Sequence, residues 1–311
     1  MNTKLATLLL AFVCLAGCAG ATTNLSIPTT GLSGAPEQIP LRLLQPDGPG
    51  PFPAVVILHD CSGLGPRSSR SPDRWAQELV RQGYAVAIPD SFTTRGHAGG
   101  VCTETSPRRA EVNPFRRVLD AYAALAYLRT LPDVDGSRVG LMGGSHGGST
   151  TLASMAAPES ESELLAPAKD AGFAAAVALY PGCDGGYGSW RAVRPSGRGG
   201  PVTGYIGVYK PVAPLLILIG ADDDWTPAEP CRILAETSAR SGYPVETKIY
   251  PGAHHAFDSS NPVRYLANRV NANAPGGRGA TTGGDPAAWA DSIREVEAFF
   301  GRHLKRAGGG S

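Results

Sequence analysis

The sequence has almost no excess of charge of either sign. Its 28 lysines and arginines nearly balance 27 aspartates and glutamates, which gives a formal net charge of +1. Proteins that bind nucleic acid usually carry a clear basic excess or a basic patch. The balance therefore argues against a nucleic acid or a strongly acidic molecule as a partner.

The sequence also lacks a hydrophobic run long enough to cross a membrane. A transmembrane helix needs about 20 apolar residues, and the apolar stretch that follows Lys4 is shorter than that. A basic start, a short apolar run and then small residues are typical of an export signal. Residues 15–18 (LAGC) resemble a bacterial lipobox. We therefore expect a signal peptide over residues 1–17 and a lipid anchor on Cys18, with ordinary cleavage after Ala21 as the alternative.

No internal repeat divides the chain. With 311 residues, of which 42% are hydrophobic, it can form one large α/β domain. We place this domain at residues 39–306, after a flexible polar tether at 18–38 and before a loose tail at 307–311. We expect an exported protein, either a lipoprotein of the bacterial cell envelope or a periplasmic or secreted protein, that meets the membrane only through its N-terminal anchor.

Short apolar runs alternate with helical patterns along the domain. We expect strands at 54–58, 85–88, 139–142, 174–180, 215–219 and 245–250, and helices at 74–82, 114–129, from 146 onward, at 227–241 and at 286–305. Runs that are apolar almost throughout are typical of parallel strands covered on both faces. The pattern predicts a doubly wound, mostly parallel α/β sheet, which binds ligands at the carboxyl ends of its strands.

One serine is surrounded by glycines at the end of a predicted strand. Residues 143–147 (GGSHG) fit the pattern G-x-S-x-G and lie between the strand 139–142 and a predicted helix. In this setting the pattern is typical of a nucleophile elbow, a sharp turn that exposes the serine hydroxyl. It predicts Ser145 as a nucleophile and the backbone N–H of His146 as one donor of an oxyanion hole.

A serine nucleophile needs a base and an acid, which follow it along the chain in this kind of fold. Three aspartates, residues 222–224, come directly after the strand 215–219. Two histidines, residues 254 and 255, come shortly after the strand 245–250. Since parallel strands end at the same edge of the sheet, these groups can meet near the serine. Spacing alone leaves open which aspartate and which histidine take part.

These motifs resemble those of the dienelactone hydrolase family, which has the α/β-hydrolase fold, over about residues 40–305. In that family the acid follows a strand as glycine, two residues and aspartate, with a proline four positions further on, which selects Asp223 between Gly220 and Pro227. The histidine lies in Ala-x-His-x-Phe, which selects His255. The founding members have a cysteine nucleophile, so this chain resembles the branch that carries serine.

The resemblance implies a hydrolase of small carboxylic esters that works through a Ser-His-Asp triad and an acyl-enzyme. It also points to the N–H of Cys61 as the second oxyanion donor, and we interpret His59 and Asp60 before it as residues that shape the loop. We expect neither metal nor cofactor, because the paired histidines and clustered aspartates lack a ligand spacing. A peptidase or acyltransferase with the same triad, or a catalytically silent binding lipoprotein, are the alternatives.

Loops are expected to complete the site. Two stretches, 183–207 and 259–284, are rich in glycine and proline without a clear period, and we interpret them as surface loops. Three residues in loop regions are candidates for binding substrate, with plain packing or surface roles as the alternative: Arg95, Tyr205 and Trp225.

Four cysteines remain once Cys14 and Cys18 are assigned to the signal and the anchor. Exported proteins commonly hold even sets of cysteines as disulfides, and four cysteines allow three pairings. The predicted strand order places two of them near each other at one end of the sheet, and the other two likewise. We predict the disulfides Cys61–Cys102 and Cys183–Cys231, with four unpaired cysteines as the alternative.

Overall fold

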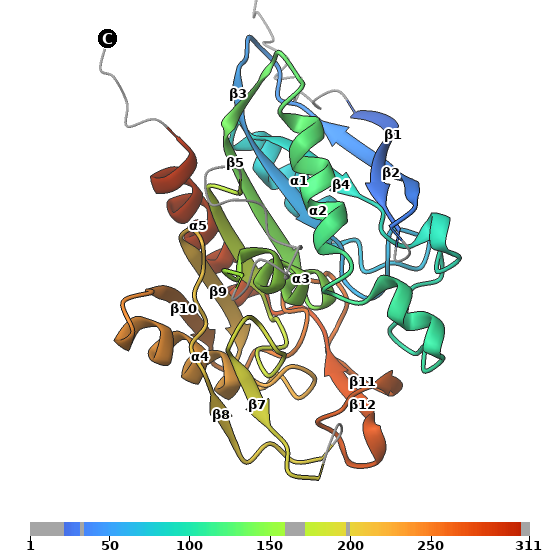
Figure 1. The fold of residues 1–311 in the computed structure, drawn as a ribbon, viewed down its shortest axis with the longest axis vertical. Helices are drawn as coiled ribbons and strands as arrows, with labels where there is room; N and C mark the ends of the chain where they lie inside the picture. The colour runs from blue at the N-terminus through green and yellow to red at the C-terminus, as the bar shows by residue number, and fades with distance from the viewer. Residues whose placement is uncertain (1–21, 32–33, 159–171, 197–199, 306–311) are drawn as a thin grey trace, which may run out of the picture.

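The apolar runs of the sequence form the parallel part of one central sheet. The computed structural model describes residues 22–31, 34–158, 172–196 and 200–305. The sheet has eight strands in the order β1-β2-β4-β3-β5-β6-β9-β10 (Figure 1). They are β1 (Thr22–Thr30), β2 (Pro36–Leu44), β3 (Phe52–Leu58), β4 (Ala85–Pro89), β5 (Val134–Gly144), β6 (Ala175–Leu179), β9 (Leu215–Gly220) and β10 (Val245–Tyr250). From β4 to β10 neighbouring strands are parallel, while β1 and β2 pair antiparallel.

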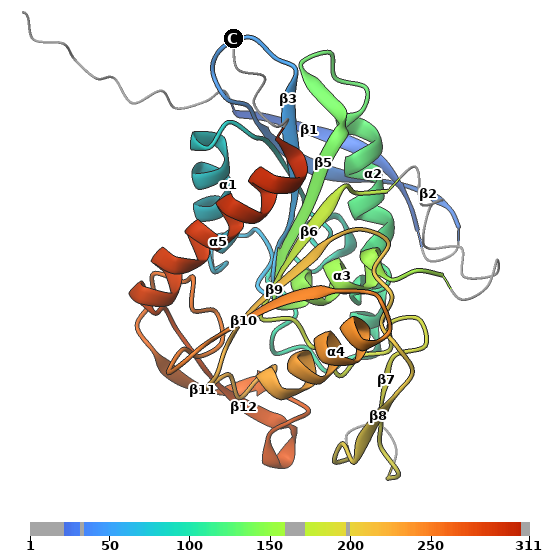
Figure 2. The ribbon, with the colours of Figure 1, turned by 90° about the vertical axis from the view of Figure 1, so that its left-hand side faces the viewer.

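Helices cover both faces of the sheet, as the continuous apolarity of its inner strands requires. Every residue of β4, β6 and β9 is buried. Figure 2 shows α1 and α5 on one face, and α2, α3 and α4 on the other. The helices are α1 (Ser71–Arg81), α2 (Val118–Leu128), α3 (His146–Met155), α4 (Ala228–Arg240) and α5 (Pro286–Leu304), with short 3-10 helices η1 (Thr93–Arg95), η2 (Pro107–Val112) and η4 (Pro275–Gly277). The predicted α/β-hydrolase fold is confirmed.

The predicted tether is wrong where the structure describes it. Instead of a flexible segment up to residue 38, the chain forms β1 and most of β2, which extend the sheet at one edge. The reason is an alternation of buried apolar and more exposed residues, in which Ile27, Ile39 and Leu41 are fully buried. Proline and threonine between these residues conceal the alternation, which is typical of a strand with one covered face.

The two stretches interpreted as loops each contain a small hairpin instead. The strands β7 (Arg191–Val193) and β8 (Gly204–Ile206) pair antiparallel, and so do β11 (Arg264–Val270) and β12 (Arg278–Thr282). Both hairpins project beyond the carboxyl ends of the parallel strands (Figure 1). They stand at the edge of the sheet where a ligand site is expected.

Both predicted disulfides are confirmed. Cys61 is bonded to Cys102 and Cys183 to Cys231, with 5.0 Å between the two Cα atoms in each pair. Neighbouring strands place the members of each pair at the same end of the sheet, as the sequence predicts. Disulfides of this kind are typical of proteins from oxidising compartments outside the cytoplasm.

The predicted signal peptide and Cys18 lie outside the described residues, and so does the tail at 307–311. In the part of the chain that the structure describes, no helix is both long and apolar enough to cross a membrane.

Candidate active site

Ser145 lies in the sharp turn between β5 and α3. Its backbone has φ 54° and ψ −113°, a conformation that residues with side chains rarely adopt and that is typical of the nucleophile elbow. The neighbouring glycines are needed for close approach. A Cβ atom at Gly147 would lie 2.2 Å from the carbonyl oxygen of Leu58 on β3, and one at Gly143 would lie 2.4 Å from that of Gly147. Larger residues would push the helix away from the sheet.

Ser145, His255 and Asp223 meet at the carboxyl ends of β5, β10 and β9. The Oγ atom of Ser145 is 2.9 Å from His255 Nε2, and His255 Nδ1 is 2.8 Å from Asp223 Oδ2. All three residues are buried. Asp223 also accepts hydrogen bonds from the backbone N–H groups of Trp225 and Thr226. An imidazole held in this way by a carboxylate can take the proton of the serine hydroxyl.

The competing aspartates and histidine lie apart from this arrangement. Asp224 is exposed and accepts hydrogen bonds from the backbone N–H and the hydroxyl of Thr281 on β12. Asp222 is also exposed, and its carbonyl oxygen lies 2.9 Å from His254 Nδ1. The family pattern therefore selected the acid and the base that contact each other.

The backbone N–H groups of Cys61 and His146 are available for an oxyanion. His146 is the first residue of α3, so its N–H has no partner within the helix. Cys61 lines the same pocket as Ser145 and His255. In the described part of the chain, neither N–H donates a hydrogen bond to a protein atom. Two such donors beside a nucleophile can stabilise the charge of a tetrahedral intermediate.

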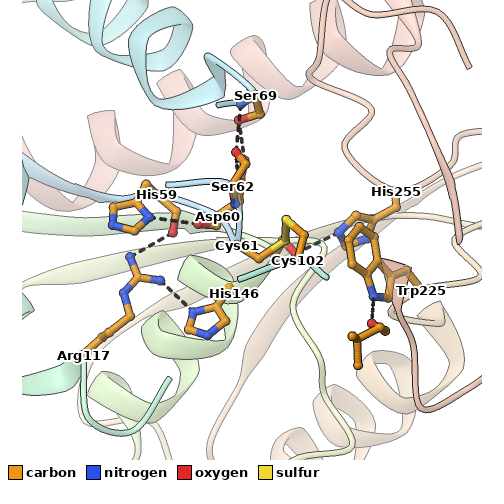
Figure 3. The surroundings of a disulfide bond; sticks show 12 residues. His59, Asp60, Cys61, Ser62, Ser69, Cys102, Arg117, His146, Trp225 and His255 are labelled. Carbon is orange, nitrogen blue, oxygen red and sulfur yellow. Dashed lines mark hydrogen bonds between the residues drawn. A yellow bond between two sulfur atoms is a disulfide. The ribbon is translucent and has the colours of Figure 1, made fainter. Parts of the chain in front are cut away.

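His59 and Asp60 shape the loop that carries Cys61, as interpreted from the sequence. Asp60 accepts hydrogen bonds from the backbone N–H and hydroxyl of Ser62 and from the hydroxyl of Ser69 (Figure 3). The Nδ1 atom of His59 lies 2.9 Å from the carbonyl oxygen of Asp60. Burial, with the nearby Arg117 charge, lowers the pKa of His59 to about 3. It is therefore a neutral, structural histidine.

Of the three candidates for substrate binding, Trp225 lines the pocket and the other two do not. The Trp225 ring centre is 4.8 Å from that of His255. The guanidinium of Arg95 is bound to Asp120 and Glu37 instead. Tyr205 stacks on Trp190, with 4.9 Å between ring centres. Both are occupied by packing partners, so these two expectations are corrected.

The pocket has several lining residues that the sequence did not indicate. It has a volume of about 640 Å³, which includes its open mouth, and three arginines line it: Arg67, Arg264 and Arg269. Two of them come from β11, in a stretch expected to be an irregular loop. Their position depends on how that hairpin folds over the sheet, and no local sequence signal gives it.

The Cys61–Cys102 disulfide links the loop that carries Cys61 to its surroundings. The carbonyl oxygen of Cys61 accepts from the N–H of Val101, and that of Cys102 accepts from the N–H of Val270 on β11. In turn, the indole N–H of Trp225 donates to the Val270 carbonyl oxygen at 2.8 Å. These contacts hold the loop that carries Cys61 against the wall of the pocket beside His255.

For a reaction catalysed at Ser145, Cys102→Ser is expected to lower kcat by about tenfold or more at temperatures where the protein is still folded, since the N–H of Cys61 is a candidate oxyanion donor and misplacing one such donor costs up to about 10²–10³ in rate. Cys231→Ser is the matched control, because it removes the other disulfide, away from the pocket. It should mainly lower the melting temperature, through a loss of about 2–4 kcal/mol in stability. Kinetics and thermal melts of both variants test this, and equal kcat in the two would contradict it.

Comparison with known proteins gives both sequence and fold relatives. A 121-residue segment is 32% identical to the protein YcjY of Escherichia coli (strain K12), and covers 39% of this chain and 35% of that protein. The chain thus matches about a third of that relative's length. The solved structure of the dienelactone hydrolase-like promiscuous phosphotriesterase P91, from metagenomic libraries, aligns with a TM-score of 0.57 at 21% identity, over 92% of this chain and all of that one.

A third relative is esterase 2 of Thermogutta terrifontis, whose apo form aligns with a TM-score of 0.56 at 16% identity, over 94% of this chain and 97% of that one. At these identities the two structural likenesses show the shared fold alone. The model of the dienelactone hydrolase family matches residues 39–304, which is most of the chain. This protein belongs to the dienelactone hydrolase family.

Proposed function

We propose that this protein is a serine hydrolase that cleaves small carboxylic esters. The observation that carries the proposal is the continuous chain of contacts from Ser145 Oγ to His255 Nε2 and from His255 Nδ1 to Asp223, at 2.9 and 2.8 Å. Next to it are an open pocket and two free backbone donors, which are what acyl transfer requires.

The proposed reaction has two steps. His255 takes the proton of Ser145 as Oγ attacks the ester carbonyl carbon, and the carbonyl oxygen becomes an oxyanion between the N–H groups of Cys61 and His146. The intermediate collapses, the alcohol leaves with the proton from His255, and an acyl-enzyme remains. Water, activated by the same imidazole, then releases the acid and restores the serine. Asp223 keeps Nδ1 protonated and stabilises the imidazolium.

A panel of nitrophenyl esters of increasing acyl length, next to peptide nitroanilides, tests this function against its alternatives. We expect turnover of esters and labelling of Ser145 by a fluorophosphonate probe, which requires an activated serine. Turnover of the peptides alone would favour a peptidase, and transfer to an added alcohol in preference to water would favour an acyltransferase. Failure of the probe to label the protein would favour a silent binding protein.

We further propose that the preferred ester carries a negative charge. Asp60 is the only carboxylate of the described residues that line the pocket, and serine donors occupy its oxygens. Arg269 faces the Trp225 ring at 5.9 Å, and its buried Nε has no hydrogen-bond partner among the described residues. Partial burial lowers the pKa of Arg269, but a guanidinium stays charged at neutral pH. The lining thus favours an anionic group.

Arg269→Met is expected to lower kcat/KM for a nitrophenyl monoester of glutarate by about 10- to 100-fold, because a hydrogen bond to a charged group contributes about 1.5–3 kcal/mol. Hydrolysis of the uncharged nitrophenyl butyrate should change far less. Arg278→Met is the matched control: Arg278 belongs to the same hairpin, but it binds the carbonyl oxygen of Asn268 and does not line the pocket. Equal losses on both esters would argue against an anion site.

We also propose that the protein is exported and anchored through Cys18. Two disulfides fit a destination in an oxidising compartment. In a bacterial host, Cys18→Ala should abolish labelling by an alkyne fatty acid and either release the protein from the membrane fraction or block its processing. Unchanged membrane retention of this variant would show that the protein is held by other means.

A further inference from the structure

Two consecutive arginines, Arg116 and Arg117, precede α2, and both are buried, yet they serve different parts of the molecule. Arg116 reaches toward the N-terminal strands, where it pairs with Glu37 at 3.2 Å and with Asp120 at 3.8 Å. Arg117 instead reaches His59 and His146, which lie beside the candidate nucleophile (Figure 3).

Arg117 binds two uncharged acceptors at once. One guanidinium nitrogen lies 2.8 Å from His146 Nδ1, and the other donates to the carbonyl oxygen of His59 at 2.9 Å. Burial and the Arg117 charge hold the pKa of His146 well below its usual range. The imidazole is therefore neutral, and its Nδ1 accepts the hydrogen bond.

The charge of Arg117 is unusually placed. The side chain is fully buried, and no carboxylate in the described part of the chain lies within 4.0 Å of its nitrogens. Three carboxylates act on it from farther away: Asp60, Asp90 and Asp120, the last already bound by Arg95 and Arg116. Burial lowers the pKa of Arg117 to about 10, so it remains a cation at neutral pH. A buried charge without a direct ion pair is costly for stability.

The two acceptors belong to the two segments that carry the candidate oxyanion donors. These are the start of α3 with His146 and the loop after β3 with Cys61, which we call the α3 arm and the loop arm. His146 carries one of the N–H donors, and the carbonyl of His59 lies two residues before the N–H of Cys61. A single planar guanidinium with fixed donor directions therefore spans the α3 arm and the loop arm. Loss of this contact would free the two arms to move relative to each other.

We propose that Arg117 is a positioning residue that fixes the spacing of the Cys61 and His146 donors, and that its unpaired positive charge adds to the stabilisation of the oxyanion between them. This inference rests on the proposed ester hydrolysis. It predicts an effect on the transition state rather than on substrate binding, because the hole faces a full negative charge only after the serine has attacked.

The test compares Arg117→Met, Arg117→Lys and Arg116→Met. Arg117→Met is expected to lower kcat by about 10- to 100-fold with little change in KM, as for a contact made in the transition state. A trifluoromethyl ketone inhibitor measures the stabilisation of the oxyanion directly. Ser145 Oγ adds to its carbonyl carbon, the carbonyl oxygen becomes the oxyanion, and the proton passes to His255. Its inhibition constant should rise by the same factor as kcat falls.

The two other variants separate positioning from packing. Arg117→Lys keeps the charge but cannot donate to both acceptors in a fixed plane, so its kcat should fall less than that of Arg117→Met. It should also stay folded if Arg117→Met does not. Arg116→Met removes the neighbouring arginine, which is also buried but lies outside the site. It should lower the melting temperature and leave kcat and the inhibition constant close to wild type.

Titration of active sites with the fluorophosphonate probe gives every rate per competent serine. If the Arg117 variants melt earlier but keep wild-type kcat and inhibitor affinity per labelled site, the role is structural and the proposal is overturned. A rise in KM alone would overturn it as well. If the wild-type protein itself is neither labelled nor inhibited, the proposed hydrolase function fails instead, so the two failures are distinguishable.

Discussion

Replacing Ser145 with alanine is expected to lower kcat for nitrophenyl ester hydrolysis by about 10³-fold or more while the fold is retained. Its hydroxyl is the group that His255 Nε2 faces at 2.9 Å, and alanine offers no nucleophile there. Any residual rate would come from the oxyanion donors and substrate binding alone. Steady-state kinetics and circular dichroism of the purified variant measure the two parts of this prediction.

His255→Ala should cause a loss of the same order, because the hydroxyl is a poor nucleophile without its base.

Ser154→Ala is the matched control for the nucleophile. Ser154 is likewise a buried serine but lies inside α3, where its hydroxyl donates to the carbonyl oxygen of Thr150 and has no contact with His255. This variant loses the same atom and should keep its activity. If Ser145→Ala retained most of the wild-type rate, the assignment of the nucleophile would be wrong.

The second large effect is expected at the acid. Asp223→Asn should lower kcat by about 10⁴-fold, the size of effect seen when a triad imidazole is held in the wrong tautomer. One carboxylate oxygen accepts from the N–H groups of Trp225 and Thr226, and the other faces His255 Nδ1. An asparagine that keeps the first contact turns its NH2 group toward Nδ1. Nδ1 must then accept, and the proton moves to Nε2, which can no longer take the serine proton.

Asp224→Asn provides the comparison at the adjacent position. Its carboxylate contacts Thr281 on β12 and has no contact with the imidazole, so the rate should fall little. Stopped assays at one saturating ester concentration suffice, because the expected difference between the two variants is several orders of magnitude. An equal loss at Asp224 would reassign the acid.

The parts of the molecule that could be predicted from the sequence are those with a local physical cause. β4 and β9 are apolar at nearly every position because helices cover both faces of the sheet, and this leaves a continuous run in the sequence. Ser145 and Asp223 follow strands that end in such runs, and His255 follows the less apolar β10 within five residues. Parallel strands end at one edge, so chain order and strand order together place Ser145, the aspartates 222–224 and the histidines 254 and 255 at that edge. The choice of Asp223 and His255 among them came from the family resemblance.

The rest depends on contacts between distant segments. β1 is an edge strand with one covered face, and its short alternation around Ile27 is weak beside its prolines and threonines. Arg269 reaches the pocket because β11 pairs with β12. In addition, the N–H of Val270 donates a hydrogen bond to the carbonyl oxygen of Cys102, more than 160 positions earlier in the chain. Arg117 looks in the sequence like half of a basic pair before a helix. Its neutral partners come from the loop after β3 and from α3, and nothing near it in the chain indicates them.

The conformation of Ser145 also bears on how such a protein can evolve. A non-glycine residue at φ 54° is held there at a cost of about 1–3 kcal/mol, which glycine would largely avoid. A lineage that kept this scaffold only to bind a ligand would gain stability by exchanging the serine for glycine, and nothing would select against the change. Stability and activity are thus coupled at this turn, because a change of Ser145 to glycine that removes the backbone strain also removes the proposed nucleophile. A stabilising substitution at this position would therefore be accompanied by loss of the proposed activity.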